Sequence, residues 1–153
     1  MIDYSEVSSI IKLTQATDSH MSRVARPGET KMSDQIAANK KFKKELNAGT
    51  VALVLLGVLS QAREPLYGYQ IAKQIEGSGE DVSMMKLGSL YPVLRSLERT
   101  GLLTSQVEPS ASGPPRRYYS ITESGRATLS HWANIWQHNK SFVDAVLKGA
   151  YHV

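Results

Sequence analysis

Two consecutive arginines, Arg116 and Arg117, follow two consecutive prolines at residues 114 and 115 of this 153-residue chain. A guanidinium group suits phosphate oxygens because its N–H donors form a planar fork. Proline restricts the backbone, so Pro114 and Pro115 lower the entropy lost when the arginines are held beside a ligand. The chemistry that this stretch predicts is the binding of phosphate groups.

The segment around these arginines is the most basic part of the chain. Residues 86–126 carry a net charge of +3, while the whole chain carries +4. Six cations lie there, namely Lys86, Arg95, Arg99, Arg116, Arg117 and Arg126. This excess indicates a polyanion as a binding partner. The alternative is that the two adjacent arginines are only the solvated end of a strand.

Other chemistries find little support in the composition. The chain has no cysteine, which excludes disulfides, zinc–thiolate sites and cysteine nucleophiles. His131 and His138 lie two helical turns apart, too far to share one metal ion within a single chain. No serine stands in a nucleophile-elbow sequence, and "GSGE" at residues 77–80 lacks the ending of a phosphate loop. We therefore expect no enzyme activity, no metal and no cofactor.

The length of the apolar segments bears on location. The longest apolar run, residues 51–59, is far shorter than the roughly 18 residues that a membrane span needs. The opening residues do not resemble a secretion signal. We expect a cytoplasmic protein without a membrane partner.

The elements that position the basic residues start with a helix. Residues 1–31 hold only scattered apolar side chains and are expected to be an extension without stable order. The first helix is expected from Met32, with Ser33 or Asp34 as its cap. From residue 46 to 61 it is apolar nearly all the way round, so it needs cover on more than one side. After Pro65, a short second helix is predicted from the apolar stripe of Tyr69, Ile71, Ala72 and Ile75.

A third helix is predicted from about Gly88, because a proline such as Pro92 is tolerated only near the start of a helix. At about 100° per residue one face is apolar, with Leu87, Leu90, Val93, Leu94 and Leu97. The opposite face carries Gly88, Tyr91, Pro92, Arg95, Ser96 and Arg99. This face is small, polar and basic at its amino-terminal turn, which suits contact with a ligand.

Two strands follow, at residues 102–108 and 116–121. The stretch "PSASGPP" between them is expected to be an unpaired tip, longer than a two-residue turn. Three helices and a hairpin in this order predict a winged helix-turn-helix domain over residues 32–121, mainly α with a small β-hairpin wing. In such a domain Ser89, Tyr91 and Arg95 would reach base edges in the major groove, while Lys86 and Arg99 meet phosphates. The predicted DNA-binding residues are Lys86, Gly88, Ser89, Tyr91, Pro92, Arg95, Arg99, Gly113, Arg116 and Arg117.

The last segment, residues 122–153, is predicted to be one long helix capped by Thr122. Its apolar side chains recur every three or four residues, as in a helix that pairs with another helix, and we expect a homodimer. The predicted dimer residues are Leu53, Leu56, Leu129, Trp132, Trp136, Asn139, Val143, Val146 and Leu147. Such a dimer would bind an inverted repeat, with half-sites about 10 base pairs or a small multiple apart.

Three motifs in this chain occur in the order and spacing of a known family. They are "LYGYQIAKQI", "LGSLYPVLRSLERTGLL" and "GPPRRYYSITESGRATL", and through them residues 46 to about 148 resemble the PadR family of bacterial transcriptional regulators. The resemblance implies a homodimeric DNA-binding winged-helix protein, usually a repressor, whose dimer is made largely by the last and first helices. The tail resembles the smaller subgroup, and the amino-terminal extension departs from the commonest members. In size and in that extension the chain also resembles a cyanobacterial modifier of the circadian clock period.

Some relatives hold planar aromatic effectors between aromatic residues of the last helix, so Trp132 and Trp136 are candidates for an effector pocket. Phenolic acids and drug-like cations are the ligand classes to test. Packing is the simpler interpretation, because each tryptophan buries a large area. A third alternative is a winged-helix protein-interaction module that does not bind DNA.

Overall fold

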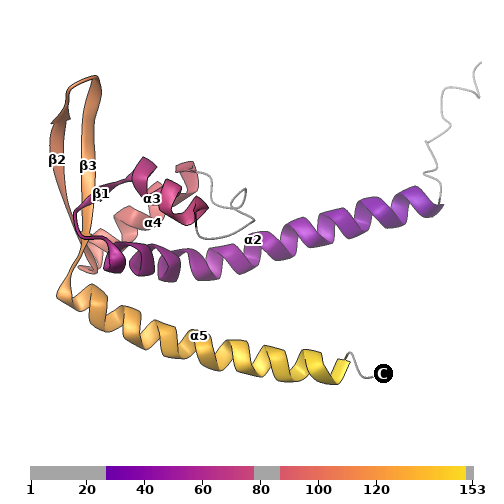
Figure 1. The fold of residues 1–153 in the computed structure, drawn as a ribbon. Coiled ribbons are helices and arrows are strands. Elements are labelled where there is room, and N and C mark those ends of the chain that lie inside the picture. Colours follow the sequence, from indigo (N-terminus) through magenta and orange to yellow (C-terminus); the bar gives the residue numbers. More distant parts are fainter. Residues whose placement is uncertain (1–26, 78–86, 151–153) are drawn as a thin grey trace, which may run out of the picture. The chain divides into compact units, whose positions relative to one another are not determined.

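The computed structural model describes residues 27–77 and 87–150 (Figure 1). Its elements are α2 (Pro27–Gln61), β1 (Leu66–Tyr67), α3 (Gly68–Glu76), α4 (Leu87–Arg99), β2 (Leu103–Ser110), β3 (Gly113–Ile121) and α5 (Glu123–Ala150). This confirms the predicted fold class, which is mainly α with a small hairpin wing and a long last helix. The chain divides into two compact units, residues 1–41 and 42–153.

The start of the first helix was predicted incorrectly. α2 begins at Pro27 rather than Met32, so Ser33 and Asp34 lie inside the helix and not at its cap. Proline suits a first helical position because its missing N–H has no partner in the first turn. Residues 1–26 lie outside the described part of the chain.

The core of the second unit is formed by apolar side chains from α2, α3, α4 and the sheet. Its buried members are Leu55, Leu56, Leu59, Leu66, Ile71, Ile75, Leu90, Leu94, Leu97, Leu103 and Tyr119. The predicted stripes of α3 and α4 are confirmed at their buried members, Ile71, Ile75, Leu90, Leu94 and Leu97. Ala72 and Val93 are partly buried against the core, and Tyr69 is 52% exposed. The side chain of Leu87 lies outside the described residues. Leu56, which was predicted to lie in a dimer interface, is 0% exposed. This prediction is corrected, because a side chain fully covered by its own chain has no surface to offer a partner.

The sheet has three antiparallel strands in the order β1-β3-β2. The two-residue strand β1 was not predicted; it pairs Leu66 with Tyr119 and Tyr67 with Tyr118. β3 therefore lies between the strand that precedes α3 and the strand that follows α4. The wing is tied by backbone pairing to the start of α3.

The hairpin is longer and tighter than expected. Ser110 pairs with Gly113, so the turn is the two-residue Ala111–Ser112 and not the seven-residue tip predicted from the prolines. Pro114 and Pro115 belong to β3, at the point where the register shifts between Glu108 and Ser110. A proline has no N–H to donate to the ladder, and a bulge is a place where that donor is not needed.

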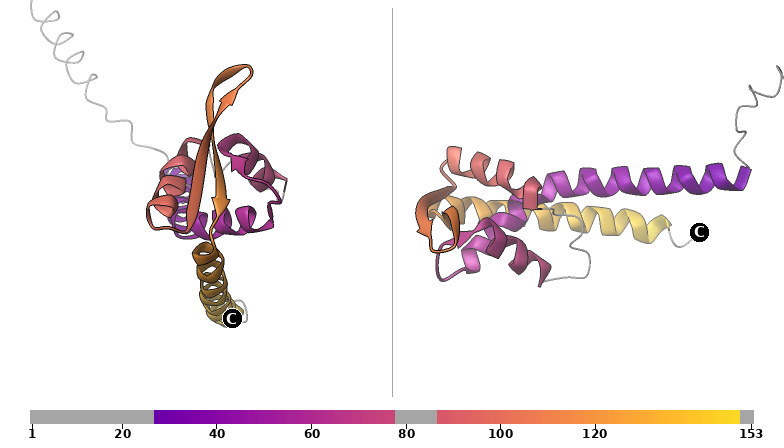
Figure 2. Two further views of the ribbon diagram at one scale, coloured as in Figure 1. Left: turned by 90° about the vertical axis from the view of Figure 1, so that its left-hand side faces the viewer. Right: turned by 90° about the horizontal axis from the view of Figure 1, so that it is seen from above.

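α5 starts where the sheet ends. The N–H of Gly125 donates to Oγ1 of Thr122 at 3.0 Å, which confirms Thr122 as the cap. A guanidinium N–H of Arg126 donates to the carbonyl of Ser60 at 3.1 Å and fixes the first turn of α5 to the end of α2. The β2–β3 hairpin and α5 extend from the helical core in different directions, the hairpin upward and α5 across the view of Figure 1 (Figures 1 and 2).

Candidate nucleic-acid interface

One face of α4 is open to solvent, as predicted. Leu90, Leu94 and Leu97 anchor the opposite face in the core. The predicted DNA-binding residues of α4 that the structure describes are all exposed, namely Gly88, Ser89, Tyr91, Pro92, Arg95 and Arg99. Lys86 lies outside the described residues. The core side of α4 therefore fixes the helix while its polar side stays free to meet a partner.

The two adjacent arginines of the wing have different surroundings, because neighbouring residues of a strand point to opposite faces. The guanidinium carbon of Arg116 lies 4.6 Å from the centre of the Tyr67 ring, a cation–π arrangement. Arg117 instead donates an N–H to Oγ of Ser105 at 2.9 Å. That hydroxyl donates to the carboxylate of Glu98. Arg117 thus links β3 through β2 to α4.

The wing and the helices enclose a cleft of about 400 Å³. Of the predicted DNA-binding residues, Tyr91, Arg95, Gly113, Arg116 and Arg117 line it. The fold therefore brings a basic residue of α4 and the basic end of the wing to one concave surface, although about twenty residues separate them in the sequence. Gly88, Ser89, Pro92 and Arg99 are exposed on α4 and are not among the residues that line this cleft.

The prediction missed the contribution of α3 to this cleft. Tyr67, Gly68 and Tyr69 also line it. Gly68 lets α3 approach α4, since a Cβ there would lie 2.7 Å from the hydroxyl oxygen of Tyr91. The signal in the sequence was Tyr69 itself, an aromatic residue within "LYGY" that we had assigned to the core.

Tyr119 forms the floor of the cleft and is 1% exposed. Burial raises the pKa of its phenol above the usual tyrosine value, and the carboxylate of Glu98 raises it further. The charges of Arg117 and Arg95 act in the opposite direction. The phenol therefore stays neutral near pH 7, and the positive charge of the cleft is not offset by it.

A second surface lies on α5. Four of the predicted dimer residues there are exposed, at 39% for Trp136, 49% for Val143, 56% for Val146 and 44% for Leu147. Asn139 is exposed among them. Ile135 and Phe142, which were not predicted, are also exposed, at 57% and 71%. At about 100° per residue these side chains fall on one face of α5. This apolar face is wider than the narrow stripe expected from the prediction, in which apolar residues recur every three or four positions.

The remaining predicted dimer residues lie closer to the core. Leu129 and Trp132 are half-buried and pack against the core of their own chain. Leu53 is half-buried and, with Trp132 and Trp136, lines a cavity of about 300 Å³ between α2 and α5. Both tryptophans of the chain thus meet at one cavity.

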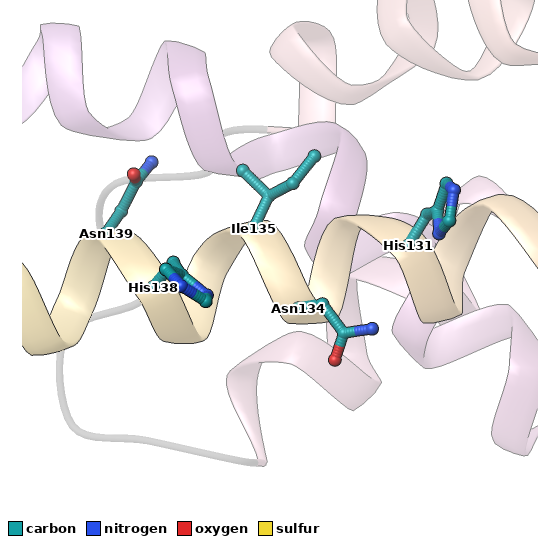
Figure 3. Close-up of a pocket in the computed structure, with 5 residues that line it drawn as sticks. All are labelled: His131, Asn134, Ile135, His138 and Asn139. Carbon is teal, nitrogen blue, oxygen red and sulfur yellow. The ribbon is translucent and has the colours of Figure 1, made fainter.

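A shallow depression on α5 is lined by His131, Asn134, Ile135, His138 and Asn139 (Figure 3). The side chains of Ile135 and Asn134 extend to different sides of the helix between the two histidines. The described residues contain no group of three or more metal-ligating side chains placed to hold an ion. Within the same part of the chain, no helix combines the length and the apolar character required to cross a membrane.

Comparisons with known proteins agree with this geometry. Residues 55–131 match the family of PadR-like transcriptional regulators. A transcriptional regulator of Mycobacterium tuberculosis is 36% identical over 80 residues, which are 52% of this chain and 71% of that protein. None of the relatives described here supports the resemblance to a circadian clock modifier.

Solved structures give the same result. A PadR family transcriptional regulator from Eggerthella lenta is 34% identical, with a TM-score of 0.59, over 76% of this chain and 96% of that one. A PadR-like transcriptional regulator from Bacillus cereus is 27% identical, with a TM-score of 0.56, over 67% of this chain and 96% of that one. The matched residues include α4, the wing and the start of α5, and the chain belongs to the PadR-like family of transcriptional regulators, which are not enzymes.

Proposed function

We propose that this chain is a homodimeric, sequence-specific repressor that binds an inverted-repeat operator in double-stranded DNA. The observation that carries the proposal is the cleft in which Arg95 of α4 and Arg116 of the wing face the same space. A helix about 10–12 Å across fits the major groove, and a neighbouring wing then meets the backbone or the minor groove. The function places the protein in the cytoplasm.

The residues of this surface have different tasks. Ser89, Tyr91 and Arg95 read base edges, and Arg99 meets phosphates together with Lys86. Arg116 contacts the backbone or the minor groove beyond the cleft. Arg117 contributes charge and also holds the wing at a fixed distance from α4, because it is hydrogen-bonded to Ser105, which in turn is hydrogen-bonded to Glu98 of α4. Gly88, Pro92 and Gly113 keep the approaching surface small.

The exposed apolar face of α5 supports the homodimer. Isolated apolar side chains on a surface are ordinary, whereas a continuous apolar face usually marks an interaction site. A helix with such a face is well suited to pair with a second copy of itself. Pairing through Trp136, Asn139, Val143, Val146 and Leu147, with Leu53, Leu129 and Trp132 nearer the core, would present two α4 helices to successive half-sites.

The test starts with selection of bound fragments from the host genome by the purified protein. The tightest fragment is then titrated with the native chain and with Arg95→Ala and Arg116→Ala. Loss of a base contact by Arg95→Ala should cost about 1–3 kcal/mol at its own position in the site only. Arg116→Ala should weaken all sites nearly equally, because phosphate contacts carry no sequence information. Both variants should keep the thermal stability of the native chain.

A negative result has a defined meaning. If the native chain retains no fragment even at about 50 mM salt, where phosphate contacts are strongest, DNA binding is wrong and a protein-interaction module is favoured. If Arg95→Ala or Arg116→Ala unfolds the chain, those side chains serve the fold and not the DNA.

A second candidate function is regulation by a planar aromatic effector, and the cavity beside Trp132 and Trp136 favours it. Both tryptophans of the chain line this cavity, so intrinsic fluorescence reports on it directly. A bound phenolic acid or drug-like cation should quench the fluorescence in a saturable manner and change the affinity for the selected fragment. Quenching that does not saturate, or that leaves DNA affinity unchanged, would contradict a regulatory site.

A further inference from the structure

Four side chains form a row of successive contacts from the wing to the last turn of α3. The guanidinium carbon of Arg116 lies 4.6 Å from the centre of the Tyr67 ring. The rings of Tyr67 and Tyr69 stack with centres 6.3 Å apart and planes 22° apart. At the far end, Nζ of Lys73 lies 5.6 Å from the centre of the Tyr69 ring. Two cations therefore cap two roughly parallel aromatic rings, and we call these four residues the α3 row.

The row is held from the side as well. Tyr118 of β3 meets the Tyr67 ring edge-on, with centres 5.4 Å apart. Tyr67 also pairs with Tyr118 in the sheet and stands at the amino-terminal boundary of α3. Its backbone N–H donates to the side-chain oxygen of Gln70 at 3.2 Å. The ring that supports Arg116 thus has little freedom to move.

The row is a surface feature. Tyr69 is 52% exposed, and Lys73 is exposed one turn further along α3. Among the described residues, no carboxylate lies within ion-pair distance of Lys73 or Arg116. Cations that rest on aromatic rings keep their full charge, because a ring attracts a cation without neutralising it. Within the described part of the chain, no carboxylate therefore competes with an anion at either end of the row.

We propose that the α3 row is a second phosphate-binding site, which contacts the sugar–phosphate backbone of the same duplex beside the groove that α4 enters. The inference rests on the proposed DNA binding and extends it to a helix that the sequence did not implicate. Tyr67 and Arg116 also line the cleft with Arg95, so the row continues the basic surface outward. Two cations at the ends of such a row suit the repeated phosphates of a nucleic-acid strand, which positively charged side chains can bind without reading bases.

Within the row the residues have separate roles. Lys73 and Arg116 bind phosphates directly. Tyr67 is a positioning residue that acts through Arg116, and Tyr69 does the same for Lys73. Lowering the rotational freedom of a long cationic side chain before it binds reduces the entropy lost in the complex.

The test measures affinity for the selected fragment by fluorescence anisotropy at several salt concentrations between about 50 and 200 mM. Lys73→Gln should lower the slope of log affinity against log salt by about 0.9 for each bound chain. From about 50 to 200 mM salt, the variant should therefore lose about 3.5-fold less affinity than the native chain does, for each bound chain. Lys148→Gln, which removes the same charge from an exposed position near the end of α5, is the matched control and should leave the slope unchanged.

The aromatic support has its own pair of variants. Tyr67→Leu should weaken binding by roughly 2- to 5-fold for each bound chain, the usual range for one exposed cation–π contact. Tyr67→Phe keeps the ring face and should restore native affinity. Thermal unfolding of both variants shows whether the fold is intact.

The outcomes separate the row from the proposed function. Suppose that the native chain binds the fragment with a steep salt dependence and that Lys73→Gln has the native slope. The proposal that the α3 row binds phosphates is then wrong, while the proposed DNA binding by α4 and the wing is unaffected. If Tyr67→Phe binds as weakly as Tyr67→Leu, the ring does not position Arg116. If the native chain binds no fragment, both proposals fall together.

Discussion

The winged-helix core and α5 are built from the same kind of apolar helical pattern, yet the fold treats them differently. Leu90, Leu94 and Leu97 of α4 are at most 5% exposed. Val143 and Val146 of α5, also spaced for one helix face, are 49% and 56% exposed. The first set is buried in the core with side chains of α2, α3 and the sheet, whereas the second set is open to solvent. The comparison teaches that the core closes on itself within one chain, while α5 keeps an apolar face open to solvent, which is the face that the proposed homodimer would cover.

The strongest way to break this comparison is to place charge on the open face. In the variant Val143→Glu with Val146→Glu, pairing would bury unpartnered carboxylates at a cost of about 3–5 kcal/mol, roughly a hundredfold or more in the dimer Kd. The domain itself should stay folded, because both side chains are already half exposed. Light scattering after size-exclusion chromatography gives the mass, and circular dichroism gives the fold.

A matched control places the same two charges on the opposite side of α5. The control variant carries Asn134→Glu with Gln137→Glu. At about 100° per residue, both residues lie about half a turn round the helix from the valines, and both are exposed. This variant should keep the native mass. If the dimer persists in the valine variant but is lost in the control variant, the two chains pair through the polar face of α5, which carries Asn134 and Gln137.

The next largest effect is expected for two leucine substitutions, each made in the variant that carries Val143→Glu and Val146→Glu and is expected to be monomeric. Leu94→Ala removes a side chain that is 0% exposed, and should lower the free energy of unfolding by about 2–5 kcal/mol. Leu147→Ala, at 44% exposed, should change it by about 0.5 kcal/mol or less. Urea denaturation measures both. Equal losses would show that α5 is covered within one chain, against the comparison.

The junction between the two regions depends on Gly125. A Cβ at this position would collide with the carbonyl oxygen of Leu102 and approach Cγ1 of Ile121 to 2.8 Å. Gly125→Ala should therefore lower the free energy of unfolding by about 1–3 kcal/mol. Gly149→Ala is the control, since a Cβ there meets nothing within 4 Å, and alanine should stabilise this helix by about 0.5–1 kcal/mol. If both substitutions stabilise the chain, the start of α5 is not packed against the strand as described.

The smallest effect is a pH dependence of the core. Because burial raises the pKa of Tyr119, the folded state holds its proton more tightly than the unfolded state does. Stability from this residue is complete below the ordinary tyrosine value of about 10 and is lost as the pH rises above it, by up to about 1.4 kcal/mol per pH unit. The difference between native and Tyr119→Phe unfolding free energies, followed by urea denaturation from neutral pH to above pH 10, should shrink accordingly. A constant difference would contradict a buried phenol.

The fold was largely predictable because its helices follow periodic patterns. The spacing of Leu90, Leu94 and Leu97 placed α4 and its core face, and Thr122 placed the start of α5. The strand β1 escaped prediction because two residues carry no periodicity, and their structure comes from pairing with β3 across more than fifty residues of chain. The wing tip was missed because a bulge accommodates prolines that would otherwise stop a strand.

The site was predicted on α4 and the wing but not on α3. Arg95 and Arg116 were predicted from their charge together with the helix and hairpin patterns that carry them. The different roles of Arg116 and Arg117 depend on which face of β3 each occupies and on what lies there, Tyr67 in one case and Ser105 in the other. Leu56 shows the same limit, since its apolar pattern fits a dimer seam and a core equally well.

The most direct test of DNA recognition by α4 and the wing is a hydroxyl-radical footprint of the native protein on its selected fragment. We expect two protected patches related by a twofold axis, with centres about 10 base pairs or a small multiple apart, and weaker protection of both patches by Arg95→Ala at the same protein concentration. The proposed recognition is contradicted if no patch is protected at about 50 mM salt, or if Arg95→Ala protects the same bases with native affinity.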